Sequence, residues 1–397
     1  MCKNRILFYS HDAYGMGNIR RTLAICDRLT REVPDLSVLI LTGSPVIHAL
    51  RIPRKVDYIK LPCLTRDKRE TFSPKFWNMS LKELMRFRSE LILSSIKSFC
   101  PNIVIVDKKP LGIKREFLHA LQYLKNQLPE TRIILGLRDI LDEPATTIPI
   151  WKTQRYYDII KRYYHHVWIY GSPKVFNTVQ EYQMPQEVAE KAVFTGYLGR
   201  TPGNVSRARI RSELGVNGSL LSLVMVGGGG DGYPIMKAYM DGLRRNGHLS
   251  STESLLVCGP EMPRDQRREV EHFCSNGIPA AFKEFSDEME NLLAAADVVV
   301  SMGGYNSICE ILSFRKKAVI VPRVSPVKEQ LIRTKRLAEL GLVNMLHPAE
   351  LTPESLMKTV ERTSSAQGLC ADVDRRIDLN GLQRIVEMTQ EMLMVAA

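Results

Sequence analysis

The sequence predicts an α/β fold in which two Rossmann-like domains, each with a doubly wound parallel sheet, face each other across a cleft. Three observations lead to this prediction. Short runs of Val, Ile and Leu alternate with helical stretches, this alternation occurs twice, and 397 residues are enough for two separate cores. Strands that are apolar throughout, rather than at every second position, are typical of parallel sheets covered by helices on both faces.

The first half begins with the apolar run Arg5–Ser10, which we expect to be a strand, followed by a glycine-containing turn and a helix over Ile19–Glu32. An amphipathic helix is expected at about Ser80–Phe99, where apolar residues recur at helical spacing. The other strands predicted in this half are Leu36–Thr42, Ile103–Val106 and Ile133–Leu137.

The second half repeats the alternation after Thr195–Asn204, a segment rich in Gly and Pro that we interpret as the linker. Its predicted strands are Leu221–Val226, Ser254–Cys258, Ala280–Phe282, Asp297–Ser301 and Lys317–Val321. We therefore expect domains over residues 1–197 and 198–375. A last segment, 376–397, contains a helix expected over Gly381–Val395 that packs back across the domain junction.

Composition narrows the classes of protein to consider. The apolar runs are far shorter than the ~20 residues of a membrane span, and the N-terminus has no signal-peptide pattern. The eight cysteines include no CxxC pair, so we expect neither a disulfide framework nor a metal site. A cytoplasmic location is the simplest expectation.

The net charge of +12 lies entirely in the first half. Residues 1–197 contain 31 Lys and Arg against 19 Asp and Glu, whereas residues 198–397 contain 24 of each. Such an excess fits either a solvated basic domain without a special partner or a domain attracted to the anionic inner face of a membrane or to a phosphorylated acceptor. Nucleic acid is not expected, since no basic helix or aromatic-basic sheet motif is visible.

An aromatic and basic segment, Leu64–Met79, stands out in this half. It combines three large aromatic residues with four basic ones in a polar, Pro-containing stretch. These residues are Phe72, Phe76, Trp77, Arg66, Lys68, Arg69 and Lys75. The segment is either a packed flap or a surface that meets the acceptor or a membrane.

The first motif with chemical meaning is Ser10–Arg21, SHDAYGMGNIRR. Gly15 and Gly17 allow a tight turn and a close backbone approach before a helix begins, and a helix N-terminus presents free N–H groups to an anion. A dinucleotide site would need a third glycine where Arg20 stands, so we expect no NAD and no other cofactor.

The second motif is a glycine cluster that directly follows a predicted strand, Val226–Gly232, VGGGGDG. Successive glycines raise the entropic cost of folding, and close approach of the backbone to a ligand is a reason to keep them. We therefore expect Gly227, Gly228 and Gly229 to contact a phosphate or a sugar. No Gly-Lys-Ser/Thr follows, so the cluster is not a Walker loop.

The third motif lies within Phe282–Gln330 and is the most specific. A buried strand leads through a turn into a helix expected to begin near Asn306, where a pyrophosphate can rest against the helix N-terminus. Asn306 and Ser307 can add hydrogen bonds, and the carboxylate of Glu310 can accept both hydroxyls of a ribose. In the competing interpretation, Asn306 and Ser307 only cap the helix and Glu310 faces solvent.

This stretch resembles the donor-binding region of GT-B glycosyltransferases, in particular family 28, which includes the bacterial peptidoglycan N-acetylglucosaminyl transferase. It also resembles the plant signature His-Cys-Gly-Trp-Asn-Ser-x-x-Glu, which reads Met302-Gly303-Gly304-Tyr305-Asn306-Ser307-Ile308-Cys309-Glu310 here. The resemblance covers most of residues 195–345. It implies a GT-B fold with an acceptor-binding N-terminal domain and a C-terminal domain that binds a nucleotide sugar.

The resemblance also implies roles for single residues. Gly303, Gly304, Asn306 and Ser307 would hold the diphosphate and Glu310 the ribose. Glu329 and Gln330 would bind the hydroxyls of the donor sugar, and the segment from Phe285 to Met289 would embrace the uracil ring. The implied reaction moves a sugar from a nucleoside-diphosphate sugar, most plausibly UDP-linked, to an acceptor hydroxyl, with inversion and without a metal ion.

Two departures from these families matter. Met302 replaces the phosphate-contacting His of the plant signature, and Asn18 stands where the bacterial relatives have a His linked to acceptor activation. Asn cannot take a proton near neutral pH. The remaining candidates for a general base are, in order, His11, Asp12, Asp107 and Asp139, all at strand ends. Each also has a structural interpretation: turn stabilisation for the first two, and helix capping or pairing with Lys108 or Arg138 for the others.

Two other functions remain open. Nucleotide-sugar 2-epimerases share this architecture and would bind the same donor without an acceptor. A non-catalytic protein that binds a nucleotide sugar is the second alternative, because Asn18 removes the usual His.

Overall fold

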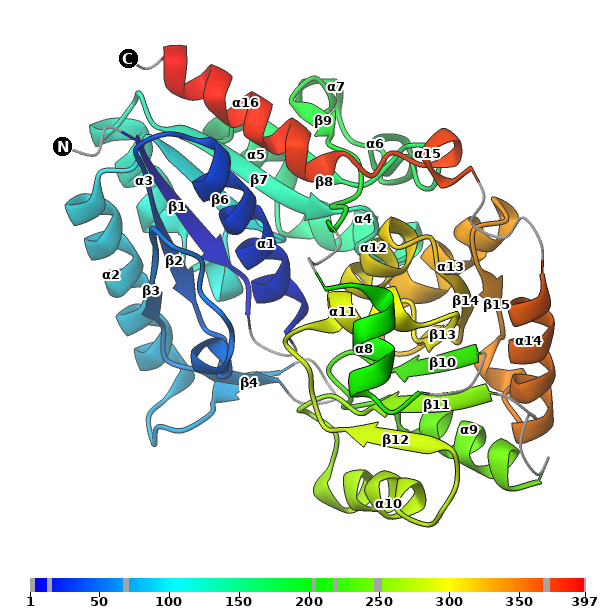
Figure 1. Cartoon of the computed structure of the whole chain (residues 1–397). Helices are drawn as coiled ribbons and strands as arrows, with labels where there is room; N and C mark the ends of the chain where they lie inside the picture. Colours follow the sequence, from blue (N-terminus) through cyan, green and yellow to red (C-terminus); the bar gives the residue numbers. More distant parts are fainter. Residues whose placement is uncertain are drawn as a thin grey trace. The chain divides into compact units, whose positions relative to one another are not determined.

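The computed structural model describes residues 4–12, 16–66, 71–201, 205–216, 220–245, 252–366 and 372–395. The chain forms two compact units (Figure 1). The first unit comprises Met1–Leu198 together with Asn380–Ala397, and the second comprises Gly199–Leu379.

The first unit is built on a seven-stranded sheet in the order β3-β2-β1-β6-β7-β8-β9, with every neighbouring pair parallel. All four strands predicted in this half are present, with bounds within one residue. The strands are β1 Asn4–Ser10, β2 Leu36–Thr42, β3 Val56–Lys60, β6 Ile103–Asp107, β7 Arg132–Arg138, β8 His166–Tyr170 and β9 Ala192–Phe194. The four strands at the centre of the sheet are therefore the ones that the sequence indicated.

Helices on both faces cover this sheet. Helix α1 (Gly17–Glu32) contacts the last helix, α16 (Gly381–Val395), and both lie in blue and red side by side in Figure 1. Helix α2 (Leu81–Phe99) packs on α3 and begins with a capping box in which Ser80 and Glu83 satisfy each other's backbone N–H groups. The remaining helices include α3 Leu118–Gln127, α4 Pro144–Thr153, α5 Tyr156–Tyr163, α6 Thr178–Glu181 and α7 Gln186–Ala189.

The second unit has a six-stranded parallel sheet in the order β12-β11-β10-β13-β14-β15. Its strands are β10 Leu220–Met225, β11 Thr252–Val257, β12 Ala280–Lys283, β13 Val298–Ser301, β14 Lys317–Ile320 and β15 Asn344–Met345. Its helices are α8 Arg207–Glu213, α9 Tyr233–Arg245, α10 Arg264–Cys274, α11 Met289–Ala295, α12 Tyr305–Ser313, α13 Glu329–Glu339, α14 Pro353–Ser365 and α15 Val373–Arg376. The five predicted strands are again present.

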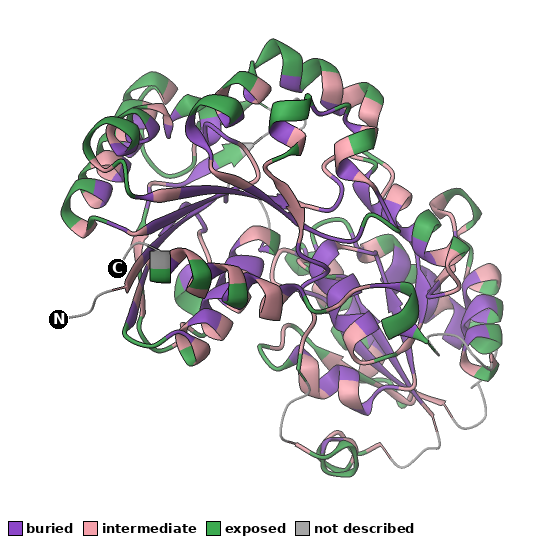
Figure 2. Ribbon diagram, turned by 90° about the horizontal axis from the view of Figure 1, so that it is seen from above, coloured by how far each residue is buried: buried purple, intermediate pink, exposed green. Residues whose placement is uncertain are grey.

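Burial follows the layers. In Figure 2 the central strands of both sheets are mostly buried, whereas the outer strands are partly exposed and the helices expose one side. Helix α12 differs, because all residues from Tyr305 to Leu312 are buried. A helix enclosed on all sides requires apolar or small residues around its circumference, so the charged Glu310 within it calls for a specific explanation.

The chain passes twice between the two units, and these two connections lie together. The N–H group of Gly199 donates to the carbonyl oxygen of Leu379 at 3.2 Å, and Leu198 forms an isolated antiparallel bridge with Asn380. Helix α16 is then held on the first unit by a 2.6 Å hydrogen bond from Arg28 to Gln383. The second unit is thus inserted between β9 and α16 of the first.

A buried polar network ties α2 to the centre of the first sheet. The guanidinium of Arg88 on α2 binds both oxygens of Glu116, at 2.6 and 2.8 Å, and the Tyr9 hydroxyl on β1 donates to Glu116 at 2.5 Å. Arg88 also donates to the Pro62 carbonyl oxygen at 2.5 Å. Arg88 and Glu116 are almost inaccessible to solvent, so each charge depends on the other.

Arg88→Met should lower the free energy of unfolding of the first unit by about 3–5 kcal/mol, because it leaves the Glu116 carboxylate buried without its cation. Urea unfolding followed by tryptophan fluorescence measures this, since the three tryptophans, Trp77, Trp151 and Trp168, all lie in this unit. The control is Arg86→Met on the same helix: Arg86 is 77% exposed and should matter by less than about 0.5 kcal/mol. Equal effects of the two substitutions would contradict the structural role of the network.

Candidate functional site

The carboxyl edge of the second sheet gathers the loops that carry the predicted donor-binding residues. Successive loops are joined through their backbones: Gly259 N–H donates to the Glu284 carbonyl oxygen at 2.8 Å, and Glu261 N–H donates to that of Gly228 at 2.7 Å. The loops after β10, β11 and β12 therefore form one connected rim. In open parallel sheets this edge is where ligands bind.

Close packing of the backbone explains part of the glycine cluster after β10, and open space beside it explains another part. A Cβ atom at Gly229 would come within 2.2 Å of the Cys258 carbonyl oxygen, and Gly227 and Gly229 have φ angles of 63° and 91°. At Gly228 a Cβ would meet only the flexible Glu261 carboxylate, at 2.8 Å, and at Gly227 it would meet nothing. Gly229 thus serves loop packing, while the space at Gly227 is open to a ligand.

The turn between β13 and α12 is shaped by Gly303 and Gly304. Gly303 has a φ of 78°, and a Cβ there would lie 2.7 Å from the Thr334 hydroxyl oxygen. Gly304 is the N-cap of α12 and, as a glycine, provides no side-chain cap. The N-terminal amides of α12 thus have no side-chain acceptor at the cap position, which suits an anion.

The competing interpretation of this motif does not fit the structure. Asn306 and Ser307 are the second and third residues of α12 rather than its cap, and each is only 8% exposed. Glu310 lies in the second turn and is 1% exposed, so it is not a solvated surface residue. A carboxylate held at this depth is expected to have a specific polar partner.

Glu329 and Gln330, the first two residues of α13, are both buried and both engaged. The Gln330 side-chain oxygen accepts from the backbone N–H of Arg323 at 3.0 Å, and the Glu329 carboxylate contacts Arg333 at 2.8 Å. Arg333 is fully buried; it donates to the Gly303 carbonyl oxygen at 3.1 Å and lies 5.7 Å from the centre of the Tyr305 ring. Glu329 and Arg333 therefore fasten α13 to the turn that precedes α12.

Arg323 extends this network to the glycine cluster. Its guanidinium lies 3.5 Å from Glu329 and 3.3 Å from Asp231, the residue between the last two glycines of the cluster. The sequence interpretation missed both arginines. A usable signal was present, because Arg333 follows Glu329 by four residues, the spacing of a helical ion pair.

The uracil-binding prediction concerns the loop after β12. Phe285 is half-buried in this loop, and Met289 begins α11 with 7% of its surface exposed. Both lie on the same sheet edge as the glycine cluster. Neither shows a polar contact that would argue for another role.

In the first unit, Asp12 is fixed at the carboxyl end of β1. Its carboxylate accepts from Ile19 N–H at 3.1 Å and from the Thr42 hydroxyl at 2.6 Å. Burial raises the pKa of Asp12 to about 6. Gly17 begins α1, whereas Gly15 lies outside the described residues.

Asn18 and Asp107 meet through Arg21. Arg21 donates to the Asn18 side-chain oxygen at 3.1 Å and to Asp107 at 2.6 Å, while the Asn18 amide donates to the His11 carbonyl oxygen at 2.5 Å. His11 itself is 4% exposed. Hydrogen bonds thus connect His11, Asn18, Arg21 and Asp107 in one chain, in which Asp107 is paired with Arg21.

Asp139 has a different environment. It is fully buried, and its two oxygens accept from the Tyr197 hydroxyl at 2.7 Å and from Ile140 N–H at 2.8 Å. The contact with Tyr197 fixes the end of β7 against the segment that follows β9, whereas the contact with Ile140 is local. This geometry favours a structural role over proton transfer.

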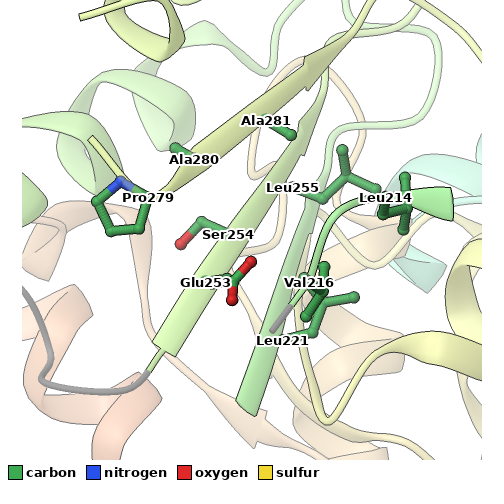
Figure 3. A pocket seen from close by; sticks show the side chains of 9 residues that line it. All are labelled: Leu214, Val216, Leu221, Glu253, Ser254, Leu255, Pro279, Ala280 and Ala281. Carbon is green, nitrogen blue, oxygen red and sulfur yellow. The ribbon is translucent and has the colours of Figure 1, made fainter. Parts of the chain in front are cut away.

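A separate shallow pocket lies at the opposite, amino-terminal edge of the second sheet (Figure 3). Glu253 and Ser254 on β11 are its polar residues, and the rest of the lining is apolar. The other lining residues are Leu214, Val216, Leu221, Leu255, Pro279, Ala280 and Ala281. None of the predicted site residues belongs to it.

Comparison with known proteins identifies the second unit. Residues 223–371 match the glycosyltransferase family 28 C-terminal domain. The UDP-N-acetylglucosamine--N-acetylmuramyl-(pentapeptide) pyrophosphoryl-undecaprenol N-acetylglucosamine transferase of Sulfurihydrogenibium sp. is 39% identical over 79 residues. These residues are 20% of this chain and 23% of that protein, so the alignment spans about a quarter of the relative's length.

Solved structures share the fold over the whole chain. MurG from Acinetobacter baumannii superposes with a TM-score of 0.60 over 98% of this chain and 99% of its own, at 14% identity. A Listeria monocytogenes protein described as a candidate UDP-N-acetylglucosamine 2-epimerase has a TM-score of 0.62 over 96% and 94% of the two chains, at 12% identity. The chain therefore has the GT-B fold, and its second unit carries a family 28 domain. No described helix is both long and apolar enough to cross a membrane.

Asp12→Asn should gain stability relative to the wild type as the pH rises. The folded pKa of about 6 lies above the unfolded value of about 3.9, so the free energy of unfolding of the wild type falls as pH rises through this window. Asn can still accept from Ile19 N–H through its side-chain oxygen, and its amide carries no charge that burial would penalise. We expect the difference between variant and wild type to grow by about 2–3 kcal/mol between pH 4 and pH 7.

Urea unfolding followed by tryptophan fluorescence at both pH values measures this difference. Asp57→Asn, at an exposed position of β3, is the matched control. A difference that does not change with pH would contradict the raised pKa of Asp12.

Proposed function

We propose that this chain, whose second unit carries a family 28 glycosyltransferase domain in a GT-B fold, transfers a sugar from a UDP-sugar to an acceptor hydroxyl. The observation that carries the proposal is the uncapped N-terminus of α12, which follows the tight Gly303-Gly304 turn and lies within the residues matched to family 28. The name of the Sulfurihydrogenibium relative supports a UDP-linked donor.

In this proposal the donor diphosphate lies against the amides at the start of α12, with hydrogen bonds from Asn306 and Ser307. Glu310 accepts the ribose hydroxyls, and Glu329 and Gln330 face the donor sugar. Gly227 offers an open approach to the same ligand, and Phe285 and Met289 flank the base. Each of these residues lies on a loop or helix start at one sheet edge, which supports a common ligand.

Charge develops on the bridging oxygen of the diphosphate as the glycosidic bond breaks. Fixed amide dipoles at a helix N-terminus stabilise such charge without reorganisation. We therefore propose a reaction that proceeds with inversion and without a metal ion, with the helix supplying the stabilisation.

The acceptor hydroxyl must lose a proton to a base, a contribution of about 10²- to 10⁴-fold in rate. Asp107 is bound to Arg21 and Asp139 to Tyr197, whereas the pKa of Asp12 is raised toward neutrality. We therefore propose Asp12 or the neighbouring His11 as the base. Asn18 would act by positioning the segment that holds His11, through the hydrogen bond to its carbonyl oxygen.

The similarity to the Listeria protein supports epimerisation as a second candidate. Incubation with UDP-N-acetylglucosamine alone separates the two functions, because an epimerase converts it to an epimer whereas a transferase leaves the sugar unchanged until an acceptor is added. A protein that binds the nucleotide sugar but shows neither reaction would be the non-catalytic alternative motivated by Asn18.

The aromatic and basic segment provides a surface for an acceptor carried by a membrane. Its described part is a short antiparallel hairpin, β4 Leu64–Arg66 and β5 Phe72–Pro74, followed by an exposed stretch leading to α2. Lys68 and Arg69 lie outside the described residues. Phe76 is 70% and Trp77 48% exposed, and Trp77 packs at a tilt against the exposed Phe87 of α2, with ring centres 5.7 Å apart.

Exposed aromatic rings beside basic groups are typical of surfaces that enter the headgroup region of an anionic leaflet. Lys75 lies over the Phe76 ring at 5.3 Å, and Arg86 projects from α2 nearby in the sequence. The relative's name includes a pyrophosphoryl-undecaprenol acceptor, a lipid. We propose that this surface makes peripheral contact with a membrane that carries the acceptor.

Glu310→Ala should weaken UDP binding by about 1.5–3 kcal/mol, the size of a lost charged hydrogen bond, which corresponds to roughly 10- to 100-fold in Kd. Calorimetric titration with UDP measures the effect, after a thermal-shift panel of nucleoside diphosphates has identified the preferred base. Glu339→Ala, at an exposed carboxylate on α13, is the control. Unchanged affinity in the Glu310 variant would remove this residue from the site.

Replacing Phe76 and Trp77 together by Ser should reduce binding to vesicles that contain anionic lipid by about tenfold or more, since both rings leave the interface. Cosedimentation with phosphatidylglycerol vesicles at low and high salt measures it, and salt should weaken wild-type binding. Ile150→Ser, at a 48% exposed apolar residue of α4, is the control. Equal binding of all three proteins would refute a membrane role for these rings.

A further inference from the structure

Arg323 joins two loops on either side of the strand that leads to the proposed diphosphate site. It follows β14, whereas Asp231 follows β10, and β13 lies between these two strands in the sheet (Figure 1). Adjacent strands are about 4.8 Å apart, so β10 and β14 are about 10 Å apart, and Arg323 and Asp231 approach to 3.3 Å from the loops that follow these strands. The strand between them, β13, leads through Met302–Gly304 into α12.

The contacts of Arg323 are looser than those of its neighbour Arg333. The guanidinium of Arg323 lies 3.3 Å from Asp231 and 3.5 Å from Glu329, and its side chain is 26% exposed. Its Nε atom is buried and has no hydrogen-bond partner among the described residues. Arg333 is fully buried and binds Glu329 at 2.8 Å. Partly exposed ion pairs with long distances contribute little to stability, so Arg323 has donor groups available for a better acceptor.

We propose that Arg323 binds the diphosphate of the nucleotide donor and that Asp231 competes with the diphosphate for its guanidinium. The inference rests on the proposed donor site and adds to it a residue that the family motifs did not indicate. Without ligand, Arg323 connects the glycine cluster to α13 through its contacts with Asp231 and Glu329. When a diphosphate binds, its oxygens replace the Asp231 carboxylate at the guanidinium.

The chemistry favours this exchange. A guanidinium presents a fork of N–H donors that matches phosphate oxygens, and a diphosphate carries more charge than one carboxylate. The N-terminus of α12, which follows the strand between β10 and β14, adds its own attraction for the anion. Asp231 is 47% exposed, so solvent can take over its carboxylate when Arg323 leaves.

The negative charge of Glu329 stays paired with a cation when Arg323 moves to the diphosphate. Its second oxygen stays bound to Arg333, which is anchored by the Gly303 carbonyl oxygen and the Tyr305 ring. The backbone of Arg323 also stays in place, since its N–H group is held by Gln330. Only the side chain of Arg323 has to move, while the turn before α12 keeps its shape.

Two single substitutions should therefore change UDP affinity in opposite directions. Arg323→Gln removes the charged donor and should raise the Kd for UDP about tenfold or more. Asp231→Asn removes the competitor and should lower this Kd several-fold. When Asp231→Asn is added to Arg323→Gln, it should leave the Kd for UDP unchanged, because the guanidinium for which Asp231 competes is already gone. Calorimetry with UDP, with uridine and with inorganic pyrophosphate measures the three affinities on the full chain.

Uridine lacks phosphates, so its affinity should not change in any variant, whereas pyrophosphate should follow UDP. Arg209→Gln, at a 73% exposed arginine of α8, is the matched control and should bind like the wild type. All variants should melt within a few degrees of the wild type, because the contacts they remove are partly exposed.

The outcomes separate the inference from the proposed function. Wild-type binding of UDP with unchanged affinity in Arg323→Gln would overturn the inference and leave the donor site standing. Weakened binding in Arg323→Gln without a gain in Asp231→Asn would refute the competition. A wild-type chain that binds neither UDP, another nucleoside diphosphate nor pyrophosphate would overturn both proposals.

Discussion

In both units every strand of the main sheet runs in the same direction, and this constraint decides where polar chemistry can collect. Parallel strands need crossover helices, which cover both faces and leave only the sheet edges for functional groups. The carboxyl edge then collects loops from distant parts of the sequence. It brings the glycine cluster near residue 228 beside the turn at Gly303 and the start of α13. In the first unit it gathers Asp12, Asp107 and Asp139.

Two kinds of interaction hold the carboxyl edge of the second unit, and they differ in stiffness. Glycines such as Gly229 let neighbouring loops pack backbone to backbone, an arrangement that any side chain would disrupt. The two arginines that contact Glu329 differ in exposure: Arg333 is enclosed, whereas Arg323 is partly exposed. The rim is therefore rigid in its main chain and adjustable in one side chain, a combination suited to holding a ligand in place after admitting it.

The sequence predicted those elements whose residues depend mainly on their neighbours in the chain. Central strands are apolar throughout and were predicted within a residue or two, whereas β3, β8, β9 and β15 were missed because they are short, partly polar or at an edge. The donor motif identified α12, but Arg333 acts on Gly303, thirty residues away, and no local pattern gives that contact. Asp107 illustrates the same limit: the structure pairs it with Arg21, which is 86 residues away in the sequence, and no local pattern predicts that contact.

The last helix completes the first unit, so the second unit is an insertion whose two ends meet at Gly199 and Leu379. On the ribosome, residues 199–379 emerge and can fold while the first unit still lacks α16, because domains generally fold as units during synthesis. The N-terminal half must wait for the final residues of the chain before the outer side of α1 is covered. The residues of the second unit are therefore all synthesised before the first unit is complete, because α16 follows them in the chain.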